Sequence, residues 1–206
     1  MSTRAVAAAA AVVLLAAGCG GNEGQHSEPP PTASQSVGTP GASTTPITPQ
    51  PIPPGNPTKT PAGGLPRPSQ VNSLNPSVVA ATVAAITYRY DTAIDNSPSD
   101  AQRRAKPWLT SEFARLLELG PVAAPGAEWN TWIQHRAYTT STAVDATEDG
   151  APPDTTTRAD RTIAVTVHPV GRDRWHGASQ QYALFIELTR DSVIGSWKVS
   201  RLLAQE

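Results

Sequence analysis

Apolar and polar residues follow two different periods along the second half of the chain. Between residues 75 and 117 the apolar residues recur at steps of three and four, which is typical of helices with one buried face. From residue 138 onward apolar and polar residues alternate, which is typical of strands with one buried face. The pattern therefore predicts helices first and strands afterwards.

The first predicted helix begins at Asn75, a favourable N-cap, with Pro76 at the first helical position. Its apolar stripe extends over about four turns. The stripe comprises Val79, Val83, Ile86, Tyr90 and Ala93.

The second predicted helix has Ser97 as its cap, Pro98 at the first position and Asp100 placed to complete a capping box. Pro107 ends it, because proline cannot continue a helix.

The third predicted helix is capped by Thr110 and ends at Gly120. It directs Phe113, Leu116 and Leu117 inward. After it, the spacing of Trp129, Trp132 and Ile133 predicts a short turn that packs back onto the core.

Four alternating runs predict four strands, at residues 138–146, 162–167, 182–188 and 197–201. Helices followed by consecutive strands indicate an α+β fold, in which a curved, cone-like antiparallel sheet encloses the helices. We expect this domain to occupy residues 74–206.

The first third of the chain has a different composition. Thirteen of the 21 prolines lie before residue 70, and all eleven aromatic residues lie at or beyond Tyr88. A segment so poor in large apolar residues cannot form a core. Residues 19–73 are therefore predicted to be a disordered, extended spacer, with a proline-docking ligand or a glycosylated stalk as alternatives.

The N-terminus has the outline of a secretory signal peptide over residues 1–18. Arg4 precedes an apolar run from Ala5 to Ala17, which is too short to span a bilayer. The only cysteine, Cys19, follows Leu14-Leu15-Ala16-Ala17-Gly18, and this run resembles the lipobox of bacterial lipoproteins. The resemblance implies acyl chains such as palmitate on Cys19 and an anchor on the extracytoplasmic face of the membrane. An ordinary cleaved signal peptide is the alternative.

The domain as a whole also resembles a known superfamily. The run from Arg104 to Thr110 after a long first helix, and the closing Trp197-Lys198-Val199, are similar to nuclear-transport-factor-two-like (cystatin-like) domains. Extracytoplasmic members include accessory proteins of conjugation and type IV secretion machines. The resemblance implies a non-catalytic protein-interaction module in an envelope assembly, although this chain has a lipid anchor where those members have a spanning helix.

Other members of this superfamily are isomerases and dehydratases with Asp, His or Tyr in a conical pocket. The corresponding candidates here are Tyr88, Tyr90, Asp91, Asp95, His135 and His168. We expect Tyr90 in the core and both aspartates in solvent, which argues against catalysis. A small-ligand-binding protein or an isomerase-like or dehydratase-like enzyme remains the alternative, and a cell-wall-binding lipoprotein is a third possibility.

Metal ions, cofactors and nucleic acids are not expected. The four histidines, His26, His135, His168 and His176, have no metal-ligand spacing. From residue 74 onward there are 13 basic and 15 acidic residues, a net charge of −2, whereas nucleic-acid binding favours a basic surface. The densest basic cluster, Arg103, Arg104 and Lys106, is predicted to be a solvated, ion-paired helix face.

A protein partner is expected, and the candidate contacts are Trp175, Arg172 and Arg174, because Trp and Arg are enriched in binding hot spots. Trp129 and Trp132 are predicted to pack in the core. The sequence makes no prediction of oligomeric state.

Overall fold

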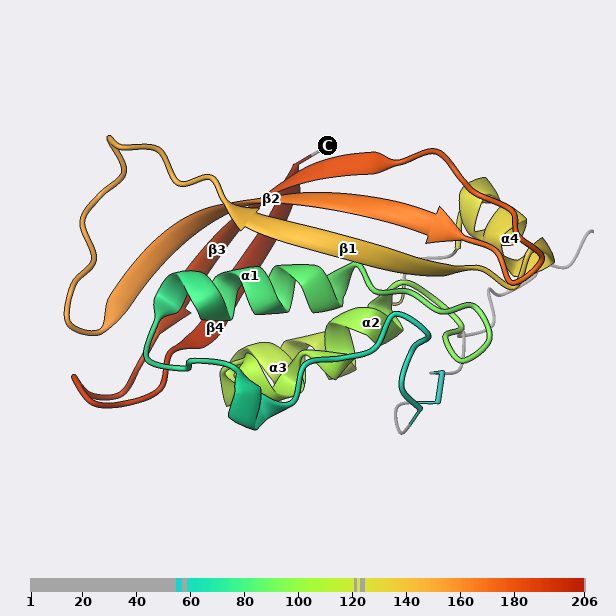
Figure 1. The fold of residues 1–206 in the computed structure, drawn as a ribbon. Coiled ribbons are helices and arrows are strands. Elements are labelled where there is room, and N and C mark those ends of the chain that lie inside the picture. Colours follow the sequence, from blue (N-terminus) through green and yellow to red (C-terminus); the bar gives the residue numbers. More distant parts are fainter. Residues whose placement is uncertain (1–54, 57–58, 121, 123–124, 206) are drawn as a thin grey trace, which may run out of the picture. The chain divides into compact units, whose positions relative to one another are not determined.

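The computed structural model describes residues 55–56, 59–120, 122 and 125–205. The predicted signal peptide, Cys19 and the linker up to residue 54 lie outside the described residues. The described part contains four α-helices and one four-stranded antiparallel sheet (Figure 1), which confirms the predicted α+β class.

The helices precede the strands, as the change of period predicts. The α-helices are α1 (Pro76–Thr87), α2 (Ser99–Arg104), α3 (Ser111–Leu119) and α4 (Ala127–Gln134). A short 3-10 helix, η1 (Pro68–Gln70), precedes α1, and a second one, η2 (Lys106–Trp108), lies between α2 and α3.

The sheet consists of β1 (Tyr138–Asp145), β2 (Arg158–Val170), β3 (Gln180–Thr189) and β4 (Lys198–Gln205). Its spatial order is the chain order, β1-β2-β3-β4, and every neighbouring pair is antiparallel. Both β1 and β4 are therefore edge strands.

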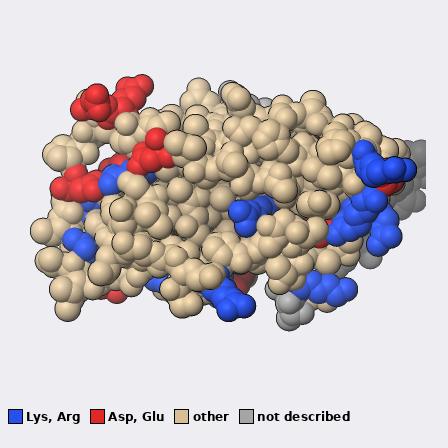
Figure 2. Space-filling view, in the orientation of Figure 1, with Lys and Arg blue, Asp and Glu red and all other residues tan. Residues whose placement is uncertain are grey.

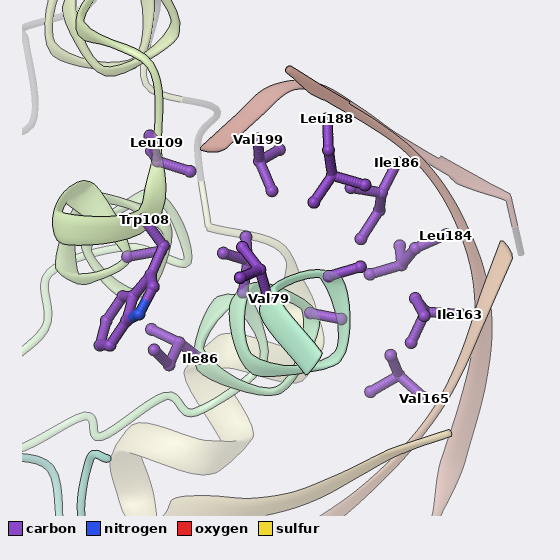
Figure 3. Close-up of a cluster of buried hydrophobic side chains, with 14 of the residues drawn as sticks. Val79, Ile86, Trp108, Leu109, Ile163, Val165, Leu184, Ile186, Leu188 and Val199 are labelled. Carbon is purple, nitrogen blue, oxygen red and sulfur yellow. The ribbon is translucent and has the colours of Figure 1, made fainter. Parts of the chain in front are cut away.

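Helix α1 lies against the inner face of the sheet and forms the centre of the core. Asn75 caps it as predicted, because the Asn75 side chain accepts hydrogen bonds from the N–H groups of Ser77 and Val78. Figure 3 shows the sheet curving around the helix, with apolar side chains filling the space between them. Burying each such side chain contributes about 1.5–3 kcal/mol. The fully buried members include Val79, Val83, Ile86, Ile163, Val165, Leu184, Ile186, Leu188 and Val199.

A second, smaller cluster surrounds α4. It contains Trp129, Trp132 and Ala137, with Tyr90 and Trp175 packed against it. The two tryptophans are buried as the sequence predicts. They pack in this satellite cluster, which Tyr90 joins to the main core by contacting both.

The helix predictions need four corrections. Helix α2 begins at Ser99 after Pro98, with no side-chain cap hydrogen bond, so Ser97 does not cap it, although Asp100 Oδ2 accepts the Ser97 N–H as a capping box would require. Helix α1 ends at Thr87, so Tyr90 and Ala93 follow the helix instead of extending its stripe. Leu116 and Ile133 were expected inward, but both are about half exposed, at 52% and 49%. Short helices at the edge of a small core bury only one face, so some of their apolar residues stay at the surface.

Residues that the sequence analysis assigned to the spacer contact the folded domain. The Gly55 N–H donates to Asp100 Oδ2 at 3.0 Å, and the Ala62 N–H donates to Asp91 Oδ2 at 2.9 Å. Leu65 packs against the main core. The contacts of the domain therefore begin about twenty residues before residue 74.

Candidate interaction surface

Three buried aspartates, two in the loop after α1 and one in the first turn of α2, organise this region of the molecule. Asp91, Asp95 and Asp100 are 1%, 4% and 7% exposed. The prediction that Asp91 and Asp95 lie in solvent was wrong. Because α1 ends before them, the chain turns inward and its N–H groups need acceptors there.

Asp91 joins three separate segments of the chain. Its carboxylate accepts hydrogen bonds from the N–H groups of Ala62 and Ala93 and from Arg172 Nη2 at 2.9 Å. Burial alone would raise the pKa of the Asp91 carboxyl, but the Arg172 guanidinium and the two backbone donors together hold that pKa below its ordinary value. Asp91 is therefore a charged structural anchor beneath Arg172.

Arg104 pairs with Asp95 inside the protein. Arg104 Nη2 lies 2.8 Å from Asp95 Oδ2, Nη1 contacts Oδ1, and Nη2 also donates to the Arg89 carbonyl. The predicted solvated position of Arg104 was wrong, because its side chain is buried. The other two residues of the predicted basic cluster do form ion pairs, Arg103 with the buried Asp100 and Lys106 with the exposed Glu118.

The turn between β2 and β3 folds back on itself and is held by its own backbone. The N–H of Gly171 donates to the Trp175 carbonyl at 2.7 Å, and the N–H of Arg174 donates to the Gly171 carbonyl. The N–H of Gly177 closes the turn onto Pro169. This turn carries all three residues predicted as partner contacts.

Two glycines allow Trp175 to fold against the turn. A Cβ on Gly177 would lie 2.6 Å from the indole ring, and a Cβ on Gly171 would lie 2.9 Å from the Trp175 Cβ. With those glycines in place, the Trp175 indole stacks on the His135 ring at 4.4 Å with parallel planes. The spacing Gly-x-x-x-Trp-x-Gly is the sequence signal for this arrangement.

His135 is held from the side by an acid. His135 Nδ1 lies 2.8 Å from Asp173 Oδ2, and this contact is the main reason why the pKa of the Asp173 carboxyl is below its ordinary value. Asp173 also accepts the Trp175 N–H. Asp173 therefore contacts both members of the ring stack.

Arg172 and Arg174 have different environments. Arg172 extends inward to Asp91 and to the Arg136 carbonyl, with its guanidinium 5.4 Å from the centre of the Tyr138 ring. Arg174 is exposed. Both arginines are at least partly exposed, but the Arg172 guanidinium bonds inward to Asp91 and so supports the turn, while Arg174 extends to the surface.

We define the hairpin surface by four residues of this end: Arg136, Arg174 and His176, which are exposed, and Trp175, which is half-buried. Arg136 and Arg174 have φ values of 45° and 73°, and they are the only non-glycine residues in the described ranges with positive φ. A backbone conformation with positive φ costs a non-glycine residue on the order of 1–3 kcal/mol, and residues in such conformations cluster at functional sites. Both strained residues are arginines on one surface.

Charge is unevenly distributed over the visible face of the molecule. Lys and Arg side chains gather at the end where β2 turns into β3, and Asp and Glu side chains gather at the opposite end (Figure 2). The acidic end carries the loop after β1, which contains Glu148, Asp149 and Asp154. The hairpin surface therefore lies at the more basic end of this face.

The residues considered for catalysis are not brought together in one pocket. Tyr88 and Tyr90 take part in aromatic packing, and burial raises the pKa of the Tyr90 hydroxyl. His168 lies in β2, where its Nδ1 contacts the Ser179 hydroxyl. A cavity of about 260 Å³ between the helices and β4 has no ionisable residue in its lining, which consists of Val83, Thr87, Gln102, Ala105, Leu109, Phe113, Leu117 and Leu202.

Within the described ranges, no group of three or more His, Cys, Asp and Glu side chains is placed to hold a metal ion. None of the helices described there combines the length and the apolar character needed to cross a membrane.

Two solved structures are similar to this chain in fold. An IcmL-like type IV secretion system protein from Legionella pneumophila aligns with a TM-score of 0.40 and 13% identity, over 69% of this chain and 94% of that one. A periplasmic fragment of TraM aligns with a TM-score of 0.38 and 12% identity, over 62% of this chain and 93% of that one. No protein-family model and no curated protein matches the sequence.

Proposed function

We propose that this protein is a lipid-anchored extracytoplasmic lipoprotein whose folded domain is a non-catalytic protein-interaction module. Its setting is a cell-envelope assembly of the conjugation or secretion kind, and its hairpin surface contacts the partner.

The anchor is supported by the sequence around Cys19. A short apolar segment ending in small residues directly before the sole cysteine is what lipid attachment requires. Two acyl chains give a stable anchor because each buried methylene contributes about 0.8 kcal/mol.

The interaction role is carried by the preorganised hairpin surface. An exposed Arg174 and a partly exposed Trp175 are held in one conformation by the Gly171 turn and the His135 stack. Preorganised aromatic and arginine side chains bind partners at low entropic cost. Apolar side chains fill the space between α1 and the sheet, which favours an interaction role over an enzyme or ligand-binding protein that uses an interior pocket.

Charge reversal tests the interaction role. Arg174→Glu in the full chain should remove a protein that co-purifies with the wild type from native membranes, because the exposed charge would then repel an acidic partner. Arg115→Glu, at an exposed position on α3, is the matched control and should retain it. Equal retention by both variants contradicts the role of the hairpin surface.

The anchor has a separate test. Cys19→Ser should abolish the mass increase from lipidation and move the mature chain from the detergent phase to the aqueous phase. Unchanged mass and partitioning contradict lipid attachment.

A further inference from the structure

A groove of about 600 Å³ runs along α1 on the side away from the core. Its floor is the outer face of α1, including Val78, Ala81 and Ala85. One wall is the segment Gly63–Pro66, and the other is β1 at Ser141 and Ala143. An apolar floor between two stretches of backbone is a shape that suits an extended chain.

The β1 wall of the groove has outward-directed backbone groups. Just after β1, the Ala146 N–H donates to the Thr162 carbonyl, which continues the register of β1 with β2. Hydrogen-bonded residues alternate along an antiparallel pair, so the even-numbered residues of β1 are the ones that hydrogen-bond to β2. Odd-numbered residues direct their N–H and C=O groups away from β2. The backbone of Ser141 and Ala143 therefore faces the groove.

The protein already pairs its own chain with the start of this edge. The Thr139 N–H donates to the Tyr90 carbonyl at 2.9 Å, and the Thr92 N–H donates to the Ala137 carbonyl at 3.0 Å, forming a short antiparallel bridge. Beyond Thr139, no backbone hydrogen bond among the described residues involves the outward groups of Ser141 or Ala143. The strand edge thus continues, unpaired, from a paired stretch into the groove.

Arg89 supplies a charge at the end of the groove. Its Nη1 donates to the Gly64 carbonyl at 3.0 Å, and its Nε is buried with no hydrogen-bond partner. None of the carboxylates in the described ranges forms an ion pair with Arg89. A partly buried guanidinium without an acid attracts a carboxylate strongly, because little solvent screens the pair.

We propose that this groove binds an extended segment of a partner protein, which pairs with β1 at Ser141 and Ala143 and places an acidic side chain at Arg89. The proposal rests on the proposed function, because it gives the interaction module a peptide-binding site separate from the hairpin surface. Backbone pairing supplies affinity, small side chains lie over the alanines of α1, and Arg89 selects for an acid.

Binding of defined peptides tests the proposal. Decapeptides are selected from a random display library on the full-length protein in detergent micelles, then synthesised and measured by fluorescence anisotropy. We expect the selected peptides to carry an Asp or Glu. Replacing that acid with its amide should weaken binding by about tenfold or more, the contribution of one charge-assisted hydrogen bond. Methylating alternate backbone nitrogens should weaken it similarly.

Two protein variants address the two walls. Ala143→Pro removes one outward N–H without touching the β2 ladder, because proline is tolerated at such edge positions. Arg89→Gln removes the charge. Each should weaken binding of the acidic peptide by about tenfold or more, and Arg115→Gln should not. Circular dichroism verifies that each variant is folded, and the acid-to-amide comparison on the wild-type protein needs no variant at all.

Three outcomes contradict the proposal. The first is that no peptide is selected. The second is that neither Ala143→Pro nor the acid-to-amide change alters the binding of the selected peptides. The third is that the protein forms a dimer and that Ala143→Pro abolishes this dimer. If Arg174→Glu removes the co-purifying partner while the groove variants change nothing, the groove proposal fails and the proposed function stands.

Discussion

Asp95 and Arg104 form a two-point ion pair in the interior of the protein, with side chains 0% and 4% exposed. Asp95 also accepts the Asp91 N–H at 2.8 Å, and Arg104 reaches the Arg89 carbonyl. The pair therefore joins α2 to the loop that follows α1. That loop positions Asp91, which in turn holds Arg172 beneath the hairpin surface.

Removing one partner of this pair should be strongly destabilising. Asp95→Asn leaves the Arg104 charge buried without its counter-ion and should cost about 3–5 kcal/mol of unfolding free energy. Urea denaturation monitored by tryptophan fluorescence measures this loss of unfolding free energy. Glu118→Gln breaks the exposed pair with Lys106 and should cost less than about 1 kcal/mol. Similar losses in both variants would contradict the structural role of the buried pair.

Stability should fall in acid partly because of Asp91. The pKa of this carboxyl is lowered in the folded protein, so the folded state binds its proton less readily than the unfolded chain does. The resulting stabilisation is present above about pH 4, the ordinary range of an aspartate, and is lost as pH falls towards the lowered value.

Unfolding free energies between pH 6 and pH 2 measure this loss. Asp91→Asn should be less stable at pH 6 and should show a shallower decline below about pH 4. Asp149→Asn, in the exposed loop after β1, serves as the control and should follow the wild-type curve. An Asp91→Asn curve parallel to the wild-type curve would show that this carboxylate does not contribute.

Gly177 should be needed for the position of Trp175. In Gly177→Ala the new methyl group would lie 2.6 Å from the indole, so the ring must move and the stack on His135 must open. We expect a loss of about 1–3 kcal/mol and a change in near-ultraviolet circular dichroism. Gly150→Ala adds a methyl group in open space and should change neither quantity. An unchanged tryptophan signal in Gly177→Ala would refute the stacked arrangement.

The segment before residue 74 should contribute to stability. A chain that starts at residue 74 lacks the N–H groups of Gly55 and Ala62, so Asp100 and Asp91 each lose a donor. Each loss should cost about 1–3 kcal/mol relative to a chain that starts at residue 55. Thermal unfolding of the two chains measures the difference, and equal midpoints would contradict it.

Local signals in the sequence predict the elements, while contacts between distant segments determine the buried polar groups. The caps Asn75 and Thr110 and the alternation around Ile163 follow from neighbouring residues, and the structure contains all of them. The predicted extension of α1 to Ala93 was wrong because the bridge between Asp91 and Tyr138 turns the chain away from the helix axis. Because Asp91 and Tyr138 are far apart in the sequence, the residues around either one do not reveal this bridge.

The candidate surface is predictable only in part. Trp175 and its arginines stand out by residue type, whereas the inward path of Arg172 depends on Asp91, far away in the sequence. The positive φ values of Arg136 and Arg174 leave no sequence signal, because glycine or asparagine usually marks such positions. The edge of β1 along the groove likewise depends on strand order.

Photo-crosslinking in intact cells tests the central claim most directly. A photoreactive amino acid in place of Arg174 should yield one adduct of defined mass in the membrane fraction. The same amino acid in place of Asp149, at the opposite end of the domain, should not yield it. Equal adducts at both positions, or none at position 174 with the protein at its normal level, would contradict the assignment of the hairpin surface to a protein partner.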